Sequence, residues 1–565
     1  MNEIAVKLGE RLEKLISTEF RTQCPGGSSF DISRSLDHGD LSCTAALRLS
    51  KSLRRSPQSI ASELSDHLSG LVLSEPALSD AICKIEAQGG FINVWLSRSY
   101  WLTELASVSK QASEYGKGRV PKGKANVEFV SANPTGPLTV AHGRQAAIGD
   151  TLARILDFAG WTVEREYYLN DTGNQMRILG LSVYLRYRES CGHKVDFPED
   201  CYQGEYIRDI AAEVARNSGT ELSTMSEGEA VALCGRYAGS SIMKWIREDL
   251  KDFGVSFDTF FSQEKMESSG AAQELIERYR AAGMLYELEG AVWLSTTQFG
   301  DSKDRVLVKS DGSLTYRTPD IAYHVDKFAR GYSRMAVTVG PDHHAHTITM
   351  KAALKALALP AEDLVYLIVQ HCTLYRNGEP LKMSTRKATY ITLREILDYV
   401  GKDAGRFFFI NRSVESHLDF DLDLAVKQNK DNPVFYLQYV AARCAAIARN
   451  AAEAGVVAPE ELKDGITFAP LAEDFAKVDK DEIDLVRMIG RFGMVVQKSS
   501  DMLDQLKIIS YLTESAEQFH NYYQRRRVLT EDRAEARARL AVISALRTVF
   551  ANGLNLLGVS APEKM

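Results

Sequence analysis

The segment from residue 126 to residue 169 constrains the fold of this chain more than any other. "NVEFV" (126–130) is typical of a short buried strand, and "SANPTGPL" is typical of a turn-rich loop. "HGRQAAIGDTLARILDFAG" (142–160) has the apolar spacing of a helix that Gly160 ends, and "WTVEREYYL" (161–169) reads as the next strand. Strand, loop, helix and strand in this order form a βαβ unit, so we predict an α/β fold with a parallel sheet.

The rest of the chain divides around this unit. Residues 1–115 read as a separate α+β domain, and a Gly-, Lys- and Pro-rich linker follows it. We predict that the parallel-sheet domain spans 116–400, with a charged helical insertion near 190–285. After a junction at 401–430, residues 431–565 read as helices only.

Composition narrows the class of protein without naming a function. The 565 residues have an ordinary globular balance, with 45% apolar and 25% charged residues. The eight cysteines are scattered without a CxxC pair, which favours a reducing, cytoplasmic compartment and argues against a structural zinc. No apolar run approaches the length of a membrane span. Because the net charge is −7, an RNA partner would have to be held by local basic surfaces.

Three segments carry side chains that can do chemistry, and each has a plainer reading. His142 opens a helix after a Gly/Pro loop, where free N–H groups favour phosphate, but a lone loop histidine is more often structural. "KMSTRK" (382–387), taken alone, reads as a solvated surface loop. "DHHAH" (342–346) has three histidines, but other ligands at useful spacing are missing, so we expect no metal site.

Several motifs, in the same order along the whole chain, resemble those of class I arginyl-tRNA synthetases. They are "DHGDLSCTAA" (37–46), "VEFVSANPTGPLTVAHGR" (127–144), "EYYLNDTGNQM" (166–176), "YRTPDIAYH" (316–324), "GPDHHAH" (340–346), "GEPLKMSTRKATYITLREIL" (378–397), "HLDFDLDLA" (417–425), "DNPVFYLQYVAARC" (431–444) and "NGLNLLGVSAPEKM" (552–565). The resemblance implies an N-terminal tRNA-contacting domain, a Rossmann-type catalytic domain and an all-helical anticodon-binding domain. It also implies ATP with Mg²⁺, L-arginine and tRNA(Arg) as substrates or partners, tRNA-dependent activation of the amino acid, and a monomer.

The resemblance assigns arginine binding to Glu128, Asn133, Tyr316 and Asp320. Carboxylates suit this substrate because a guanidinium is planar, permanently charged and prefers fork-like acceptors. Without the resemblance, Glu128 would be read as an exposed strand charge and Asp320 as a helix N-cap after Pro319.

The resemblance also assigns residues to ATP and to catalysis. The catalytic set is His142, Lys382, Ser384, Arg386 and Lys387, and the ATP-binding set is Thr139, Ala141, His142, Gly340, Asp342, His343, Lys382 and Met383. Such residues would stabilise charge on the α-phosphate as the arginine carboxylate attacks it, which is mostly electrostatic catalysis.

Some positions depart from the family's usual motifs. Thr139 stands where the family usually has the first histidine of its first motif, and Ala141 stands where it has a glycine. Losing one charge-assisted hydrogen bond costs about 1.5–3 kcal/mol, which would slow activation roughly 10- to 100-fold. Thr385, Ala388 and Thr44 are further departures, and none of them removes the arginine-binding set.

The C-terminal helices carry the predicted tRNA contacts, which are Tyr436, Tyr439, Arg525, Arg526 and Arg527. Aromatic rings stack on unpaired bases and arginines hold phosphates, although an aromatic core beside solvated charge would show the same pattern.

Three hypotheses follow from the sequence. The first is a working arginyl-tRNA synthetase. The second is a paralogue that activates arginine or an analogue for another acceptor, or that serves as a slow spare copy, and the third is a non-enzymatic tRNA-binding protein. The retained substrate and ATP residues argue against the third.

Overall fold

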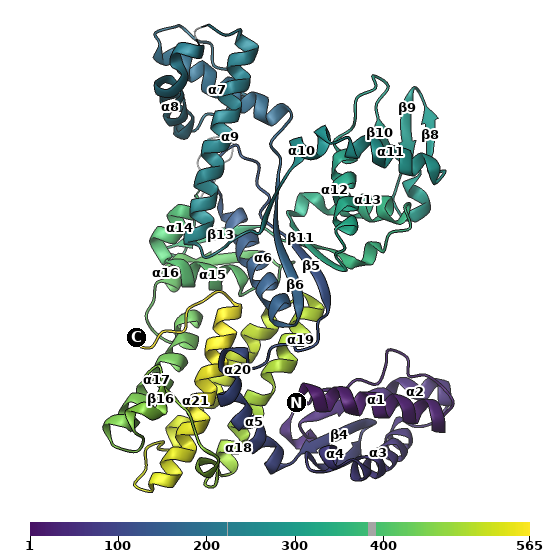
Figure 1. Cartoon of the computed structure of the whole chain (residues 1–565), viewed down its shortest axis with the longest axis vertical. Coiled ribbons are helices and arrows are strands. Elements are labelled where there is room, and N and C mark those ends of the chain that lie inside the picture. The colour runs from purple at the N-terminus through teal and green to yellow at the C-terminus, as the bar shows by residue number, and fades with distance from the viewer. Residues whose placement is uncertain (223, 382–390) are drawn as a thin grey trace.

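A five-stranded parallel sheet forms the centre of the molecule (Figure 1). The computed structural model describes residues 1–222, 224–381 and 391–565. Neighbouring strands of the sheet follow the order β12–β11–β5–β6–β7, and every pair is parallel. The strands are β5 (Gly123–Glu128), β6 (Trp161–Leu169), β7 (Thr259–Ser262), β11 (Arg334–Val339) and β12 (Leu364–Ile368). The predicted α/β fold with a parallel sheet is therefore confirmed.

The crossover helix of the predicted βαβ unit is α6 (Val140–Phe158). It starts two residues before the predicted helix and ends before Gly160. The φ of Gly160 is +101°, a backbone conformation that glycine adopts without strain. Strand β5 starts and ends earlier than predicted: Gly123 already pairs with β6, while Val130 has a φ of +68° that no strand tolerates. The strand therefore stops at Glu128 and turns sharply into the loop before α6.

Two insertions interrupt the parallel sheet. The first follows β6 and consists of α7 (Asn174–Ser190), α8 (Glu205–Leu222) and α9 (Glu227–Asp252). The prediction of a helical stretch near 190–285 was wrong in part, because strand β7 lies within it and pairs with β6. This four-residue edge strand is too short for its apolar pattern to distinguish it from a helix.

The second insertion leads back to the sheet. It contains α10 (Gln263–Ser268), α11 (Ala271–Ala281) and an antiparallel sheet of β8 (Leu285–Leu288), β9 (Ala291–Leu294) and β10 (Arg305–Val308). Helix α12 (Arg317–Ala329) then precedes β11.

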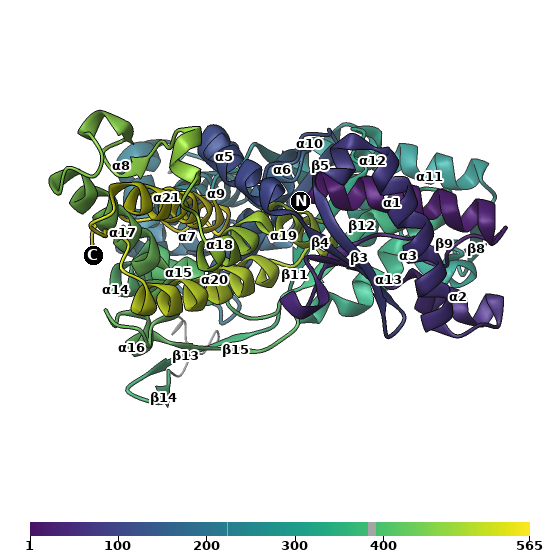
Figure 2. The same ribbon diagram turned by 90° about the horizontal axis from the view of Figure 1, so that it is seen from below.

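The N-terminal residues form an antiparallel sheet with helices. Its order is β1–β2–β4–β3, from β1 (Asp31–Ile32), β2 (Leu41–Cys43), β3 (Ile82–Gln88) and β4 (Phe91–Leu96). Helices α1 (Asn2–Glu19) and α3 (Pro57–Ser74) contribute its core. Seen from below (Figure 2), this domain lies beside the C-terminal helices, and Lys498 pairs with Asp31 at 3.2 Å between them.

The C-terminal part is a helical bundle. Its helices are α17 (Pro433–Glu453), α18 (Lys480–Gly490), α19 (Phe492–Met502), α20 (Leu506–Arg525) and α21 (Arg533–Leu556). The prediction of helices only was wrong in one detail, since β16 (Leu462–Lys463) and β17 (Thr467–Phe468) form a short hairpin.

Arg406 links α6 of the parallel-sheet domain to the end of this bundle. Arg406 of α15 (Lys402–Ile410) is fully buried and lies 2.6 Å from Asp150 of α6. Its guanidinium also donates to the carbonyl oxygen of Leu557, just past α21. No helix in the described part of the chain has the length and apolar character needed to cross a membrane.

Candidate active site

The candidate active site lies at the carboxyl edge of the parallel sheet, between β5 and β11. The chain leaves β5 toward β6 on one side, whereas β11 and β12 extend the sheet on the other side. Such a point of reversal opens a crevice where ligands bind in open α/β sheets. Glu128 ends β5, Gly340 follows β11 directly, and the N-terminus of α6 begins at Val140.

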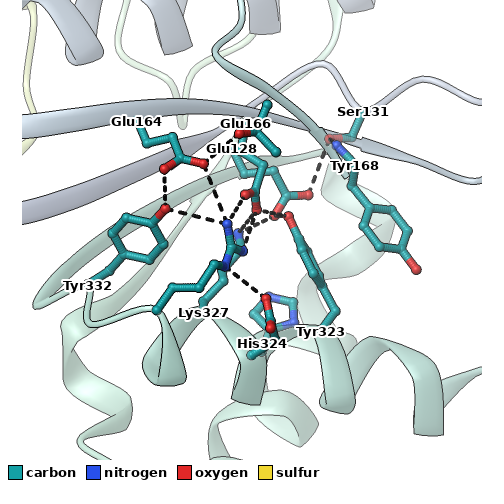
Figure 3. Close-up of polar contacts among 12 residues, drawn as sticks. Glu128, Ser131, Glu164, Glu166, Tyr168, Tyr323, His324, Lys327 and Tyr332 are labelled. Atoms are coloured by element: carbon teal, nitrogen blue, oxygen red, sulfur yellow. Dashed lines mark hydrogen bonds and ion pairs between the residues drawn. The ribbon is translucent and has the colours of Figure 1, made fainter. Parts of the chain in front are cut away.

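Glu128 belongs to a largely buried network of charged and hydroxyl groups (Figure 3). Its side chain is only 9% exposed, and its Oε2 lies 2.5 Å from the ammonium of Lys327. The Tyr323 hydroxyl lies 3.0 Å from the same oxygen, whereas Oε1 accepts a hydrogen bond from the hydroxyl of Ser131 at 3.2 Å. The reading of Glu128 as an exposed strand charge is therefore wrong.

Glu166 of β6 forms the other half of this network. It is fully buried and accepts hydrogen bonds from Arg330, while Lys327 lies 3.7 Å away. Burial alone would raise the pKa of Glu166, but hydrogen bonding from Arg330 and the charge of Lys327 hold it below its ordinary value. Both glutamates thus have cations beside them within a low-dielectric environment.

Asp320 faces the same crevice from the first turn of α12. Burial and the nearby charge of Glu128 raise its pKa to about 7, so the two carboxylates are close enough to interact. Nε2 of His346 lies 3.7 Å from the Asp320 carboxylate, and burial lowers the pKa of that imidazole to about 4, so the contact is not an ion pair near pH 7. The N-cap of α12 is Tyr316, so the N-cap reading of Asp320 is wrong.

The other two residues predicted for arginine lie closer to solvent. Asn133 donates from Nδ2 to Oε1 of Gln175 at 2.6 Å. Tyr316 is 65% exposed, and the guanidinium of Arg317 lies 4.5 Å from the centre of its ring. Among the described residues, neither forms a hydrogen bond with Glu128 or Asp320, so their assignment to arginine stays a prediction.

His142 lies in the first turn of α6 with its protonation state constrained by the helix. The backbone N–H of Thr139 donates to Nδ1 at 3.1 Å, so Nδ1 is an acceptor and the proton of the neutral ring is on Nε2. Burial lowers the pKa of His142 to about 4, which keeps the ring neutral near pH 7. The Thr139 hydroxyl lies 3.3 Å from the same nitrogen. Thr139 and His142 are thus in contact as the N-cap and third residue of α6, and their assignment to ATP stays a prediction.

Of the remaining residues predicted for ATP, Gly340 is half-buried and the others are exposed or lie outside the described residues. Ala141 is exposed on the first turn of α6. Asp342 and His343 are exposed beyond β11, where the His343 Nε2 lies 3.6 Å from an Asp342 oxygen. The rest of the predicted set, Lys382, Met383, Ser384, Arg386 and Lys387, lies outside the described residues.

The predicted tRNA tyrosines line a cavity between α17 and α20. Tyr436 and Tyr439 surround the ring of His520, with ring centres 5.0 and 6.0 Å away, and the cavity has a volume of about 530 Å³. Nε2 of His520 is buried without a hydrogen-bond partner among the described residues. An aromatic cavity with an unpaired nitrogen suits a flat heterocycle that can stack and form a hydrogen bond.

The three predicted arginines differ in their contacts. Arg526 forms ion pairs with Asp479 and Asp481 at 3.5 and 2.6 Å, so part of its charge is already used within the bundle. Arg525 and Arg527 are exposed and have no ion pair with any residue in the described ranges.

Sequence reasoning missed the groups that surround Glu128. Lys327, Tyr323 and Glu166 were not predicted, although all three lie within quoted or adjacent segments. A spacing signal was available: Tyr323 and Lys327 are three and seven residues after Asp320, so all three share one face of α12.

Comparison with known proteins identifies the family. Residues 2–96 match the model described as the arginyl tRNA synthetase N terminal domain, and 104–412 match "tRNA synthetases class I (R), catalytic domain". Residues 437–565 match the DALR anticodon binding domain.

Curated relatives match over almost the whole length. An arginine–tRNA ligase of Desulfosudis oleivorans is 44% identical over 94% of this chain and 93% of its own. One from Nitratidesulfovibrio vulgaris (strain Miyazaki F) is 43% identical over 96% of both. The solved arginyl-tRNA synthetase of Thermus thermophilus has the same fold, with a TM-score of 0.78 at 20% identity, over 99% of this chain and 100% of that one. The chain therefore belongs to the arginyl-tRNA synthetase family of class I aminoacyl-tRNA synthetases.

Proposed function

We propose that this protein joins L-arginine to tRNA(Arg) at the expense of ATP, through an arginyl-adenylate, with release of AMP and pyrophosphate. The observation that carries the proposal is that the charges of Glu128, at the end of β5, and Asp320, in the first turn of α12, interact, while α6 begins after the loop that follows β5. The pair suits a guanidinium, and the helix N-terminus suits a phosphate. A site that offers both in one crevice fits an amino acid and a nucleotide that react with each other.

The amino acid is held by its side chain. Asp320 accepts two guanidinium N–H groups in a fork, and Glu128 accepts a third through Oε1. Asn133 and Tyr316 complete the predicted set at the solvent side of the crevice. The substrate's cation lowers the pKa of Asp320, because it offsets the repulsion from Glu128.

Activation is an attack by a carboxylate oxygen of arginine on the α-phosphorus of ATP. A new P–O bond forms while the bond to the leaving pyrophosphate breaks. His142 donates its Nε2 proton as a hydrogen bond to a phosphate oxygen, and its neutral ring stays in place because Thr139 holds Nδ1. A terminal ribose hydroxyl of the tRNA then attacks the carbonyl carbon and releases AMP.

Other residues are proposed for the nucleotide by resemblance. Gly340, Asp342 and His343 lie beyond the end of β11, on the side where the adenosine would bind. Lys382, Met383, Ser384, Arg386 and Lys387 would contact the phosphates. The described residues hold no cluster of three or more metal-ligating side chains, so we propose that Mg²⁺ is bound through the ATP phosphates rather than in a protein cage.

The departures at Thr139 and Ala141 act on the nucleotide half of the site. Thr139 keeps its contact with His142 but cannot supply the charged donor of a histidine. Ala141 is exposed, and its methyl group would lie toward the base. Both changes leave the arginine carboxylates untouched, so we expect them to affect the rate of activation rather than the choice of amino acid.

The C-terminal bundle binds the anticodon loop. One unpaired base enters the cavity of Tyr436, Tyr439 and His520, and Arg525 and Arg527 contact the backbone phosphates, with Arg526 in a lesser role because of its ion pairs. We further propose a monomeric, cytoplasmic enzyme whose activation of arginine requires the tRNA.

A charging assay tests the function directly. The purified protein is incubated with ATP, magnesium, labelled arginine and total tRNA, and acid-precipitable label is counted. Arginine-dependent charging that Asp320→Asn abolishes or strongly weakens is the expected result. No charging of a tRNA that another arginyl-tRNA synthetase does charge would refute the proposal and favour a paralogue with a different acceptor.

A further inference from the structure

The ammonium of Lys327 is fully buried beside Glu128, which we propose binds arginine. Its Nζ lies 2.5 Å from Oε2 of Glu128 and 3.7 Å from Oε1 of Glu166, and its side chain is 0% exposed. A site that binds a cationic substrate thus already contains a cation, which on charge alone would repel the substrate. The presence of Lys327 can be understood from which oxygen of Glu128 it leaves available as an acceptor.

We propose that Lys327 is a positioning residue that determines how Glu128 recognises the guanidinium. It occupies Oε2, together with the hydroxyl of Tyr323 at 3.0 Å. Oε1 then has only the hydroxyl of Ser131 as a donor among the described residues, and a carboxylate oxygen can accept two hydrogen bonds. Glu128 therefore offers one acceptor site, and the two-point contact falls to Asp320. This inference rests on the proposed function, because it needs arginine as the substrate.

Lys327 also balances the charge of Glu128. Glu128 and Glu166 are both buried and both contact Tyr323, and the Lys327 ammonium lies within 3.7 Å of both carboxylates. Arg330 pairs with Glu166 and not with Glu128, so Lys327 is the cation that fixes the position of Oε2 of Glu128. Lys327 therefore acts on arginine through Glu128, without touching the substrate.

The network includes residues that provide a matched control. Tyr332 contacts Glu164 and Arg330 but has no contact with Glu128. Tyr332→Phe removes one hydroxyl from the same network and leaves Lys327 and Glu128 in place. A general effect of disturbing the network would therefore appear in this variant as well.

The test measures KM for arginine and kcat separately, with ATP and tRNA saturating. Lys327→Met is expected to raise KM for arginine at least tenfold while kcat and KM for ATP stay within about threefold. Lys327→Arg, which keeps the charge, should bring KM back to within about threefold of the wild type. Tyr332→Phe should leave KM for arginine unchanged. A merely structural role would lower the fraction of active protein and thus the apparent kcat, with KM unchanged, and that result would overturn the proposal.

A double variant keeps the test decisive when Lys327→Met does not fold. Glu128→Gln combined with Lys327→Met removes both charges of the 2.5 Å pair and leaves no unpaired ion between them. Because Lys327 acts through Glu128, the double variant should have the same KM for arginine as Glu128→Gln alone. A further rise above threefold would show that Lys327 acts by another route. If the wild type does not charge tRNA with arginine, the proposed function fails first, and these variants are not needed to show it.

Discussion

We propose that Asp320 binds arginine, so its raised pKa predicts how arginine affinity depends on pH. In the ligand-free protein, burial and Glu128 raise this pKa to about 7, so about half of the Asp320 side chains are protonated at pH 7. The guanidinium needs the ionised form, so protonation competes with binding. The ionised fraction is about one tenth at pH 6 and about nine tenths at pH 8. Affinity should therefore rise about tenfold from pH 6 to pH 8 and level off above that range.

Calorimetric titration with arginine at several pH values measures this dependence. Because binding favours the ionised carboxylate, about half a proton should leave the protein per arginine bound at pH 7. Buffers of different ionisation enthalpy report that number directly. His142 and His346, with pKa values of about 4, stay neutral over this range and should not contribute.

The variant Asp320→Asn separates this carboxyl group from every other titrating group. It should bind arginine weakly and with an affinity that no longer changes between pH 6 and 8. A wild-type affinity that is constant over this range would refute the reasoning. So would an unchanged slope in Asp320→Asn, because the pH dependence would then belong to another residue.

Three further changes test other parts of the molecule. Tyr439→Ala should raise the Kd for tRNA roughly 5- to 100-fold in filter binding, since base–aromatic stacking contributes about 1–3 kcal/mol. Arginine binding should stay unchanged. An equal loss of tRNA binding and arginine binding would argue against a role of Tyr439 in the anticodon cavity. His142→Ala should lower single-turnover activation about 10²- to 10³-fold, the effect of losing one charge-stabilising donor, while an unaffected rate would exclude His142 from the phosphate site. Arg406→Met should destabilise the protein by about 1.5–3 kcal/mol in urea unfolding, because it removes one charge-assisted hydrogen bond from the buried Asp150, which keeps its ion pair with Arg154 at 2.7 Å; an unchanged free energy of unfolding would mean that the Arg406 contact does not stabilise the fold.

The parallel sheet was predictable because its signals are local. The apolar run of β5, the loop after it and the one-sided helix up to Gly160 each lie within a few residues of sequence, and together they identify a βαβ unit. Strand β7 was not predictable in the same way. Four residues that lie between an inserted helix and another helix carry too little periodicity, and only pairing with β6 makes them a strand.

The candidate site was predictable by type of residue but not by arrangement. The motifs indicated Glu128, Asp320 and His142 as polar residues next to turns. They could not indicate that Glu128 is buried, because its burial depends on α12, which comes almost 200 residues later in the chain. The hydrogen bond from the Thr139 N–H to Nδ1 of His142 could likewise not be predicted from the motif alone. The spacing of three residues permits it, but it forms because α6 starts directly after Thr139.

Charge balance at the proposed site would explain how it attracts arginine and rejects neutral analogues. Five carboxylates, those of Glu128, Glu164, Glu166, Asp320 and Asp326, lie around the two cations Lys327 and Arg330, so negative charge is in excess when all are ionised. A bound guanidinium would offset part of that excess and take the hydrogen-bond positions still free on Glu128 and Asp320. A neutral side chain of the same shape would leave the Asp320 carboxylate unpaired beside Glu128 or protonated, and either state costs binding energy. A site that selects in this way discriminates strongly at the binding step, so it does not need a second site to hydrolyse wrong products.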